Sequence, residues 1–344
     1  MEKNNRASLK NIAEEAGVSI ITASRALDSR RAHMLKENTR KKILDSAEKL
    51  NYTSNISARR FKRGKTETIS FVMPRNAFEN PVRLDFSPFS GSMIWQMIEG
   101  IIKEARKWNY DIKIEPLFEP ENPDAIISRL GYPYSDGVIL CGIWELENIE
   151  KKIKVQGIPY VVMASEPSRL PELPEIAADF GSGLRDAMHY LTEQKHKNIA
   201  IFTPSPETNI PGSRLAEARD YLLSKGCFRE DLVYTVENES KFCSIIDKIA
   251  ETSSFTAAFC HNDTMALMLI KELRKRKIDC PGNVSVIGFD DNPAYKDKGL
   301  STVSVPRKEL GSECVKILIG QIERNEEFNG RKLLPTSFIR RNTC

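Results

Sequence analysis

From residue 66 onward, short apolar runs alternate with longer amphipathic segments, and this alternation limits the folds that the chain can adopt. The apolar runs are TISFVMP, YDIKIEPL, DGVILCG, PYVVMA, NIAIFTP, AAFCHND and VSVIGFD. Between them lie segments with helical periodicity, such as MIWQMIEGIIKEARKW and TMALMLIKELRKRK. This pattern is typical of parallel sheets covered by helices on both faces. Because about 280 residues exceed one open sheet, we expect two α/β subdomains with a ligand cleft at the carboxyl ends of their strands.

The first 50 residues have a different pattern, which predicts three short helices. Ser8 can cap LKNIAEEA, and Gly17 suits the left-handed position that ends this helix. Ser19 can cap IITASRAL, so a turn of about three residues joins two helices, as in a helix-turn-helix. The apolar faces expected to form the small core are Leu9, Ile12, Ala13 and Ala16 in the first helix, and Ile43, Leu44, Ala47 and Leu50 in a third, roughly 37–50. A minimal DNA-binding module is therefore expected.

The charge distribution supports an anionic partner for this N-terminal segment. Residues 1–65 contain 16 Lys and Arg against 7 Asp and Glu, whereas the rest of the chain contains 35 against 40. A basic segment on a mildly acidic body indicates contact with a polyanion such as nucleic acid, with a solvated charged surface as the alternative. The overall composition, 40% hydrophobic and 28% charged, is that of an ordinary globular protein.

Neither a targeting segment nor a metal-binding pattern is evident. The N-terminal MEKNNRASLK has no apolar core, and no stretch approaches 18 apolar residues, so we expect a cytoplasmic protein with no contact to a membrane. Seven cysteines are scattered with no CxxC pair, which predicts reduced, structural thiols rather than disulfides or a zinc site. No cofactor or metal is expected.

Two motifs carry a resemblance to a known family. SLKNIAEEAGVSIITASRAL, followed by NTRKKILDSAEKLNYTSNISARRFKRG, resembles the head of the lactose/galactose repressor family, and the resemblance extends over essentially the whole chain. It implies a helix-turn-helix DNA-binding domain at 1–52, a hinge helix and linker at 53–66, and a ligand-binding and dimerisation domain at 67–344. The body would then have the architecture of type I periplasmic sugar-binding proteins, with two parallel-sheet subdomains.

The resemblance also implies DNA-contacting residues. It places Ile20, Ile21 and Arg25 at base-reading positions, Ser19, Thr22 and Ser24 at phosphate-contacting positions, and Asn55, Ala58, Arg59 and Phe61 in the hinge helix at the minor groove. Arg25 can bind a guanine edge bidentately, which is worth about 1–3 kcal/mol of discrimination, whereas isoleucines can only contact thymine methyls. Phe61 would be a wedge between base steps, with a polar linker as the alternative. The chain departs from the family at Asp28, Lys36 and Ser54.

Three segments of the body resemble effector-binding segments of the family. RLAEARDYLLSKG supplies Arg214, HNDTMAL supplies Asn262, and VIGFDD supplies Asp290. Trp144 could stack on a sugar ring, and Met93 lies in GSMI, where many members read NPFF. The alternatives are a surface charge for Arg214, helix or strand-end caps for Asn262 and Asp290, and a loop anchor for Trp144. An arginine, an amide and a carboxylate suit sugar hydroxyls, or a carboxylate or phosphate on Arg214.

The sequence therefore predicts a homodimeric transcriptional regulator that represses genes of sugar uptake or catabolism. The dimer is expected to bind a pseudo-palindromic operator. A small molecule, expected to be a sugar, would control this binding. Induction and corepression, the latter by a purine or phosphorylated ligand, both remain open. A carbohydrate-acting enzyme is disfavoured because Asp290 and Asp291 are adjacent strand residues that face opposite ways, and no nucleophile elbow, P-loop or metal-spaced cluster occurs. An architectural DNA binder would not need the large body.

Overall fold

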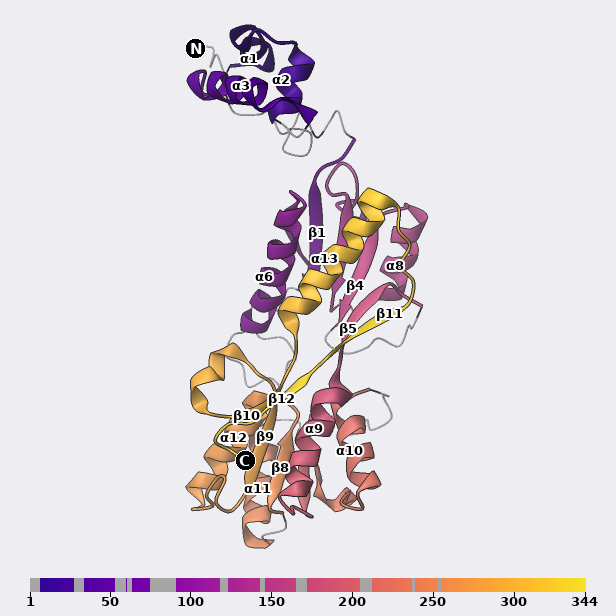
Figure 1. The fold of residues 1–344 in the computed structure, drawn as a ribbon. Coiled ribbons are helices and arrows are strands. Elements are labelled where there is room, and N and C mark those ends of the chain that lie inside the picture. Colours follow the sequence, from indigo (N-terminus) through magenta and orange to yellow (C-terminus); the bar gives the residue numbers. More distant parts are fainter. Residues whose placement is uncertain are drawn as a thin grey trace. The chain divides into compact units, whose positions relative to one another are not determined.

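The computed structural model describes residues 7–27, 34–52, 60, 64–74, 91–117, 123–142, 146–164, 172–204, 212–236, 239–252 and 255–344. The chain divides into two compact units, a head at Met1–Lys65 and a body at Thr66–Cys344, and each is described separately (Figure 1). No helix in these ranges is both long and apolar enough to cross a membrane.

The head contains the three predicted helices, α1 (Leu9–Ala16), α2 (Ile20–Leu27) and α3 (Glu37–Lys49). The Ser8 hydroxyl accepts a hydrogen bond from the Asn11 amide, and the Asn11 side chain accepts one from the Ser8 amide, so the first turn of α1 has a reciprocal cap. Gly17 ends α1 with φ 63°, the left-handed conformation that glycine adopts without strain. The prediction for the turn between α1 and α2 is confirmed.

A small apolar core holds these helices together. Its buried members are Ile12, Ala13, Ala16, Ala23, Ala26, Ile43 and Ala47, with Leu9, Val18 and Leu50 packed at its edge. The prediction that Leu44 belongs to this core is wrong, because its side chain is 41% exposed. Ile43, Ala47 and Leu50 follow the helical repeat along the inner face of α3, and Leu44 lies about 100° away from Ile43 around the helix.

The described residues of the body form two sheets of six strands each. The first has the order β11-β5-β4-β3-β1-β2, and every neighbouring pair is parallel. Its strands are β1 (Thr68–Pro74), β2 (Asp111–Leu117), β3 (Gly137–Cys141), β4 (Tyr160–Ala164), β5 (Glu175–Asp179) and β11 (Arg331–Pro335). All five residues of β3 are buried, as expected for a strand covered on both faces.

The second sheet has the order β12-β10-β9-β8-β6-β7. Its strands are β6 (Ile199–Thr203), β7 (Val233–Thr235), β8 (Ala257–Cys260), β9 (Ser285–Asp290), β10 (Ser301–Ser304) and β12 (Ser337–Ile339). The pair β10–β12 is antiparallel and the other pairs are parallel. The single residue Thr336 separates β12 from β11 of the first sheet.

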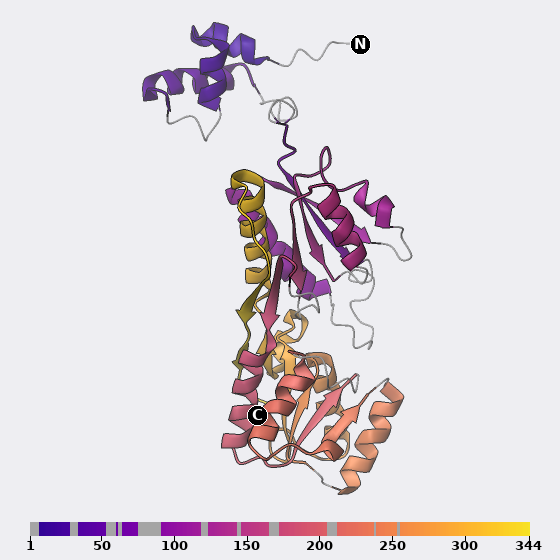
Figure 2. The same cartoon turned by 90° about the vertical axis from the view of Figure 1, so that its right-hand side faces the viewer.

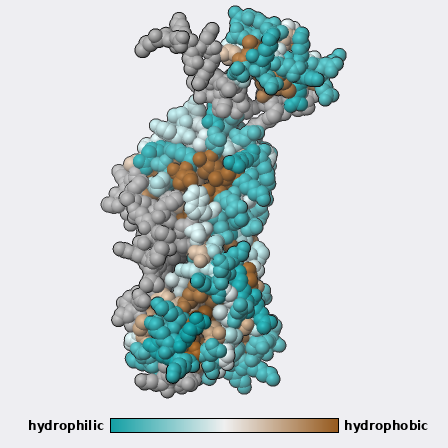
Figure 3. Space-filling model, turned by 90° about the vertical axis from the view of Figure 1, so that its left-hand side faces the viewer, coloured by the Kyte–Doolittle hydropathy of each residue, from teal (hydrophilic) through white to brown (hydrophobic). Residues whose placement is uncertain are grey.

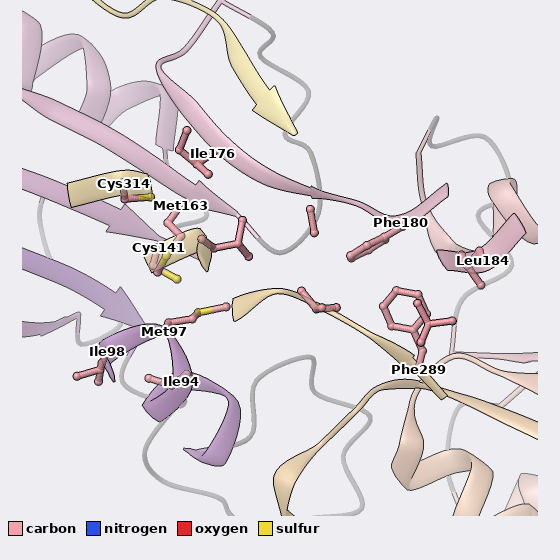
Figure 4. Packing of buried hydrophobic residues seen from close by; sticks show 14 of the residues in the cluster. Ile94, Met97, Ile98, Cys141, Met163, Ile176, Phe180, Leu184, Phe289 and Cys314 are labelled. Carbon is pink, nitrogen blue, oxygen red and sulfur yellow. The ribbon is translucent and has the colours of Figure 1, made fainter. Parts of the chain in front are cut away.

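Helices cover both faces of each sheet (Figures 1 and 2). They are α6 (Gly91–Lys107), α7 (Pro123–Ile127), α8 (Leu146–Val155), α9 (Phe180–Glu193), α10 (Arg214–Ser224), α11 (Glu239–Thr252), α12 (Asp263–Lys275) and α13 (Arg307–Arg324), with 3-10 turns η2 (Glu230–Leu232) and η3 (Pro293–Lys298). Figure 4 shows the apolar contacts around Met97, Cys141, Met163 and Cys314, and the packing of Phe180 beside Phe289.

The chain passes between the two sheets three times, after β5, after β10 and after β11. Two of these passages are hydrogen-bonded to each other, because the Thr336 hydroxyl donates to the Asp179 carbonyl at 2.7 Å and accepts from the Gly183 amide at 2.9 Å. Gly183 has no room for a β-carbon, which would lie 2.8 Å from the Thr336 hydroxyl oxygen. These passages bring the ends of α6, β9 and α13 into one region of the body.

Candidate functional site

The surface of α2 in the head is unusual for a small helical domain. Its buried residues are the small Ala23 and Ala26, whereas the large side chains of Ile20 and Ile21 are 48% and 65% exposed. A helix that only stabilised a core would bury its isoleucines and expose smaller or polar residues. Two adjacent exposed isoleucines therefore indicate a contact surface for another molecule.

Polar side chains complete this surface. Ser19, Ser24 and Arg25 are exposed and Thr22 is half-buried. The Ser19 hydroxyl accepts from the Thr22 amide at 3.1 Å and lies 2.8 Å from the Thr22 hydroxyl, so Ser19 caps α2 as predicted. Six of the ten residues predicted to contact DNA thus lie in one helix and its cap. An α-helix fits the major groove, where isoleucines can contact thymine methyls and arginine can bind guanine. The hinge residues Asn55, Ala58, Arg59 and Phe61 lie outside the described residues.

In the body, Arg214 is the first residue of α10, which the Ser213 hydroxyl caps by accepting from the Ala216 amide at 3.2 Å. The Arg214 side chain is buried, so the alternative of a surface charge is wrong. Its Nη2 donates to Asp290 Oδ1 at 3.3 Å, and its guanidinium carbon lies 4.9 and 4.4 Å from the ring centroids of Phe180 and Phe289. Cation–π contacts of this kind are stronger when water is excluded.

Asp290, the last residue of β9, is 1% exposed and is bound by a second arginine. Arg307, the first residue of α13, is also buried and donates from Nη2 to Asp290 Oδ1 at 2.8 Å and from Nη1 to the Asp290 carbonyl at 2.5 Å. Asp290 has φ 111°, a conformation that costs energy for any residue with a side chain. The contacts of both arginines hold it in place.

The cluster of Arg214, Asp290 and Arg307 contains three buried polar atoms with no hydrogen-bond partner among the described residues. They are Nε of Arg214, Nε of Arg307 and Oδ2 of Asp290. Buried polar atoms are nearly always hydrogen-bonded, so these three atoms make the cluster a candidate site for a polar ligand.

Two titratable groups beside the cluster have shifted pKa values. His261 Nε2 accepts from Arg214 Nη1 at 2.8 Å, and burial together with the positive charge of Arg214 lowers the pKa of His261 to about 2. Burial and the nearby carboxylate of Asp290 raise the pKa of Asp263 to about 7. Near neutral pH His261 is therefore uncharged, and Asp263 is only partly ionised.

The remaining predicted effector residues have different environments. Asn262 is buried, and its side-chain oxygen caps α12 by accepting from the Met265 amide at 2.9 Å, the geometry of the capping alternative. Met93 is buried in α6, next to Ser92, whose hydroxyl donates to Asn292 Oδ1 at 2.8 Å. This contact brings the start of α6 to the loop that follows Asp290. Trp144 lies outside the described residues.

Asp290 and Asp291 face different partners, as the sequence predicts. Asp291 accepts from Arg341 Nη2 at 2.6 Å, whereas Asp290 binds Arg214 and Arg307. The two carboxylates are thus not arranged for paired acid and base work on one substrate. Among the described residues, no group of three His, Cys, Asp or Glu is placed to hold a metal ion.

Sequence reasoning missed Arg307 and gave His261 no role in ligand binding. Arg307 follows SVP at a strand-to-helix passage, and no motif in the sequence sets it apart from the other arginines of the chain. The only available signal for His261 is its position directly before Asn262 at the end of an apolar strand.

Comparison with known proteins gives matches in both units. Residues 8–55 match the family model "Bacterial regulatory proteins, lacI family", and residues 188–344 match "Periplasmic binding protein-like domain". The repressor CytR of Escherichia coli K12 is 27% identical over 346 residues, with 98% of this chain and 96% of CytR covered.

Solved structures show the same fold. The lac repressor dimer bound to operator and the anti-inducer ONPF is similar with a TM-score of 0.70 and 18% identity, with 98% of this chain and 99% of that chain covered. The regulator CelR in complex with cellobiose is similar with a TM-score of 0.67 and 21% identity, with 98% and 100% covered. The expected fold, a helical head followed by two mainly parallel sheets, is confirmed.

Proposed function

Because this chain belongs to the lacI family of bacterial regulatory proteins, we propose that it is a transcriptional repressor whose affinity for operator DNA is controlled by a small molecule bound in its body. One observation carries the proposal: a single chain combines an exposed isoleucine face on α2 with a buried cluster of unpartnered polar groups in the body. The first suits a DNA groove, and the second suits a small polar ligand. Neither arrangement serves catalysis, and we propose that the protein is not an enzyme.

Sequence readout is assigned to α2. Arg25 provides the bidentate donor for a base edge, Ile20 and Ile21 exclude water and contact methyl groups, and Ser19, Thr22 and Ser24 contact phosphates. The hinge residues Asn55, Ala58, Arg59 and Phe61 are proposed to enter the minor groove, with Phe61 as the wedge. We further propose domain boundaries at 1–52, 53–66 and 67–344.

We also propose that the protein acts as a cytoplasmic homodimer on a pseudo-palindromic operator. The CytR and lac repressor matches support this assignment, the latter being a dimer bound to operator. Figure 3 shows patches of apolar residues on one face of the body. The exposed large side chains of the body include Trp95 of α6, which is 60% exposed. Exposed apolar patches mark interaction surfaces, and a second copy of the chain would cover them.

The effector site is assigned to Arg214 and Asp290, with Asn262, Met93 and Trp144 as further candidates. Cellobiose in the related CelR structure supports a carbohydrate-like ligand. The direction of control, induction or corepression, follows from which state the ligand binds more tightly.

Selection of duplexes from a random DNA pool tests this function. The full chain should enrich a sequence with twofold symmetry, bind it with an affinity that falls steeply with salt, and change that affinity on adding ligand. A chain lacking residues 1–65 should bind no DNA and still bind ligand. Retained operator binding by the truncated chain, or an affinity that ignores salt, would refute the assignment.

A further inference from the structure

The cluster at the end of β9 carries more positive than negative charge. Arg214 and Arg307 are both buried, and both donate to a single carboxylate oxygen, Oδ1 of Asp290, at 3.3 and 2.8 Å. His261, the neighbour of Arg214, contributes no charge because its pKa is lowered to about 2. Two guanidinium groups therefore share one negative partner where water is excluded, and like charges repel strongly in such surroundings.

The nearby Asp263 acts on Arg307 only through space, and its own hydrogen bonds go to other groups. Its Oδ1 accepts from the Thr302 hydroxyl at 2.5 Å and its Oδ2 from the Asn292 amide at 2.7 Å. Among the described residues, neither arginine forms an ion pair with it. Its raised pKa, about 7, also weakens its negative charge near neutral pH.

The unpartnered atoms indicate which hydrogen-bonding groups a ligand must have to bind this cluster. The Nε–H groups of Arg214 and Arg307 are donors that need acceptors, and Oδ2 of Asp290 is an acceptor that needs a donor. A carboxylate or phosphate offers only acceptors and carries the negative charge that the cluster lacks. A sugar hydroxyl can donate to Oδ2.

We propose that the effector is an acidic sugar derivative, whose carboxylate or phosphate binds Arg214 and Arg307 and whose hydroxyl donates to Asp290. This inference rests on the proposed effector site and narrows its ligand class. It makes Arg307 the residue that selects acidic over neutral sugars. A neutral sugar would leave the excess positive charge of the two arginines buried and uncompensated.

Calorimetry on the full chain with matched sugars tests the proposal. D-glucuronate and D-galacturonate are compared with D-glucose and D-galactose, and the 6-phosphates of the two hexoses form a third group. At least one acidic sugar should bind about tenfold or more tightly than its neutral counterpart, as expected for hydrogen bonds to charged groups. The uronates and the phosphates distinguish the two sources of negative charge. The proposal fails if no acidic sugar binds more tightly than its neutral counterpart.

Substitutions then test the role of Arg307. Arg307→Met should lower the affinity for the acidic sugar about tenfold or more and leave that for the neutral sugar within a few-fold, whereas Arg307→Lys should retain part of the preference. Lys308→Met is the matched control, because Lys308 is half-exposed and pairs with Glu99 rather than with the cluster. An unchanged preference in a folded Arg307→Met protein would overturn the assignment. If that variant does not fold, the comparison of sugars on the native chain decides.

The test of the ligand class and the test of the repressor function can fail independently. A neutral sugar that binds most tightly and shifts operator affinity would overturn the ligand class and leave the repressor function standing. An acidic sugar that binds through Arg307 without changing operator affinity would support the ligand class and contradict the proposed control of DNA binding.

Discussion

The two candidate sites of this protein are built in opposite ways. On α2 of the head, the candidate side chains are mostly exposed and close together in sequence, and the residues that α2 buries are alanines. In the body, the candidate side chains are buried and come from β9, α10 and α13, which lie far apart in the chain. A DNA groove needs a rigid surface that reaches outward, whereas a small polar ligand needs charged groups held where water is excluded.

The energetic consequences differ as well. In the head, the ion pair between Lys10 and Glu14 is 3.8 Å long with both side chains mostly exposed, so its loss has little effect on stability. In the body, removing Asp290 would leave the two buried positive charges of Arg214 and Arg307 without compensation. Substitutions on α2 should therefore change DNA affinity with little change in the free energy of unfolding, whereas substitutions in the buried cluster should change the free energy of unfolding.

The largest effect is expected for Asp290→Asn. Both buried arginines would lose their negative partner, and the free energy of unfolding of the body should fall by about 3–5 kcal/mol. Asp291→Asn is the matched control, since Asp291 binds the partly exposed Arg341 and should cost about 1 kcal/mol or less. All three tryptophans, Trp95, Trp108 and Trp144, lie in the body, so their fluorescence in urea titrations reports on this unit. Equal losses in the two variants would contradict a special role for the buried cluster.

A smaller effect is expected from pH through Asp263. Its pKa is raised in the folded chain, to about 7, so the folded state holds a proton that the unfolded state releases near pH 4. Stability from this group is present at low pH and is lost as the pH rises towards 7. The native chain should thus lose on the order of 2 kcal/mol, relative to Asp263→Asn, between pH 5 and pH 8.

Urea titrations of both proteins at the two pH values measure this difference. The lowered pKa of His261 makes the free energy of unfolding rise with pH below about pH 6.5. This contribution is the same in both proteins and cancels when they are compared. The Asp263→Asn substitution replaces one carboxylate oxygen with an NH2 group, and any loss of stability from this change does not depend on pH. Parallel pH profiles would show that Asp263 is ionised throughout.

The smallest effect compares two exposed apolar side chains of the head. Ile21→Ala should weaken binding to the selected operator by about 1 kcal/mol, because the isoleucine buries apolar surface against the bases. Leu44→Ala is the matched control, since Leu44 of α3 is also exposed, at 41%, and lies outside α2. Fluorescence anisotropy with labelled operator measures both. If both substitutions weaken binding equally, exposed apolar area rather than the α2 surface governs affinity.

Sequence patterns alone predicted most of the secondary structure. The apolar runs correspond to β1, β2, β3, β4, β6, β8 and β9, and the capping residues correspond to the starts of α1 and α2. These features depend on interactions between neighbours in the chain, such as hydrogen bonds at helix ends and the periodicity of burial. The strands β5, β7, β10, β11 and β12 are short or partly polar, and only pairing with distant strands specifies them.

The sequence by itself determined the type of each unit, the helix proposed to read DNA and the place of Arg214 and Asp290 among candidate ligand residues. Only the tertiary structure decided that Arg307 shares Asp290 with Arg214, that His261 is neutral, and that Leu44 lies outside the core. The physical reason is that exclusion of water and the balance of charge are properties of a packed region. They arise where the three passages between the sheets bring distant residues together, and no local pattern encodes that meeting.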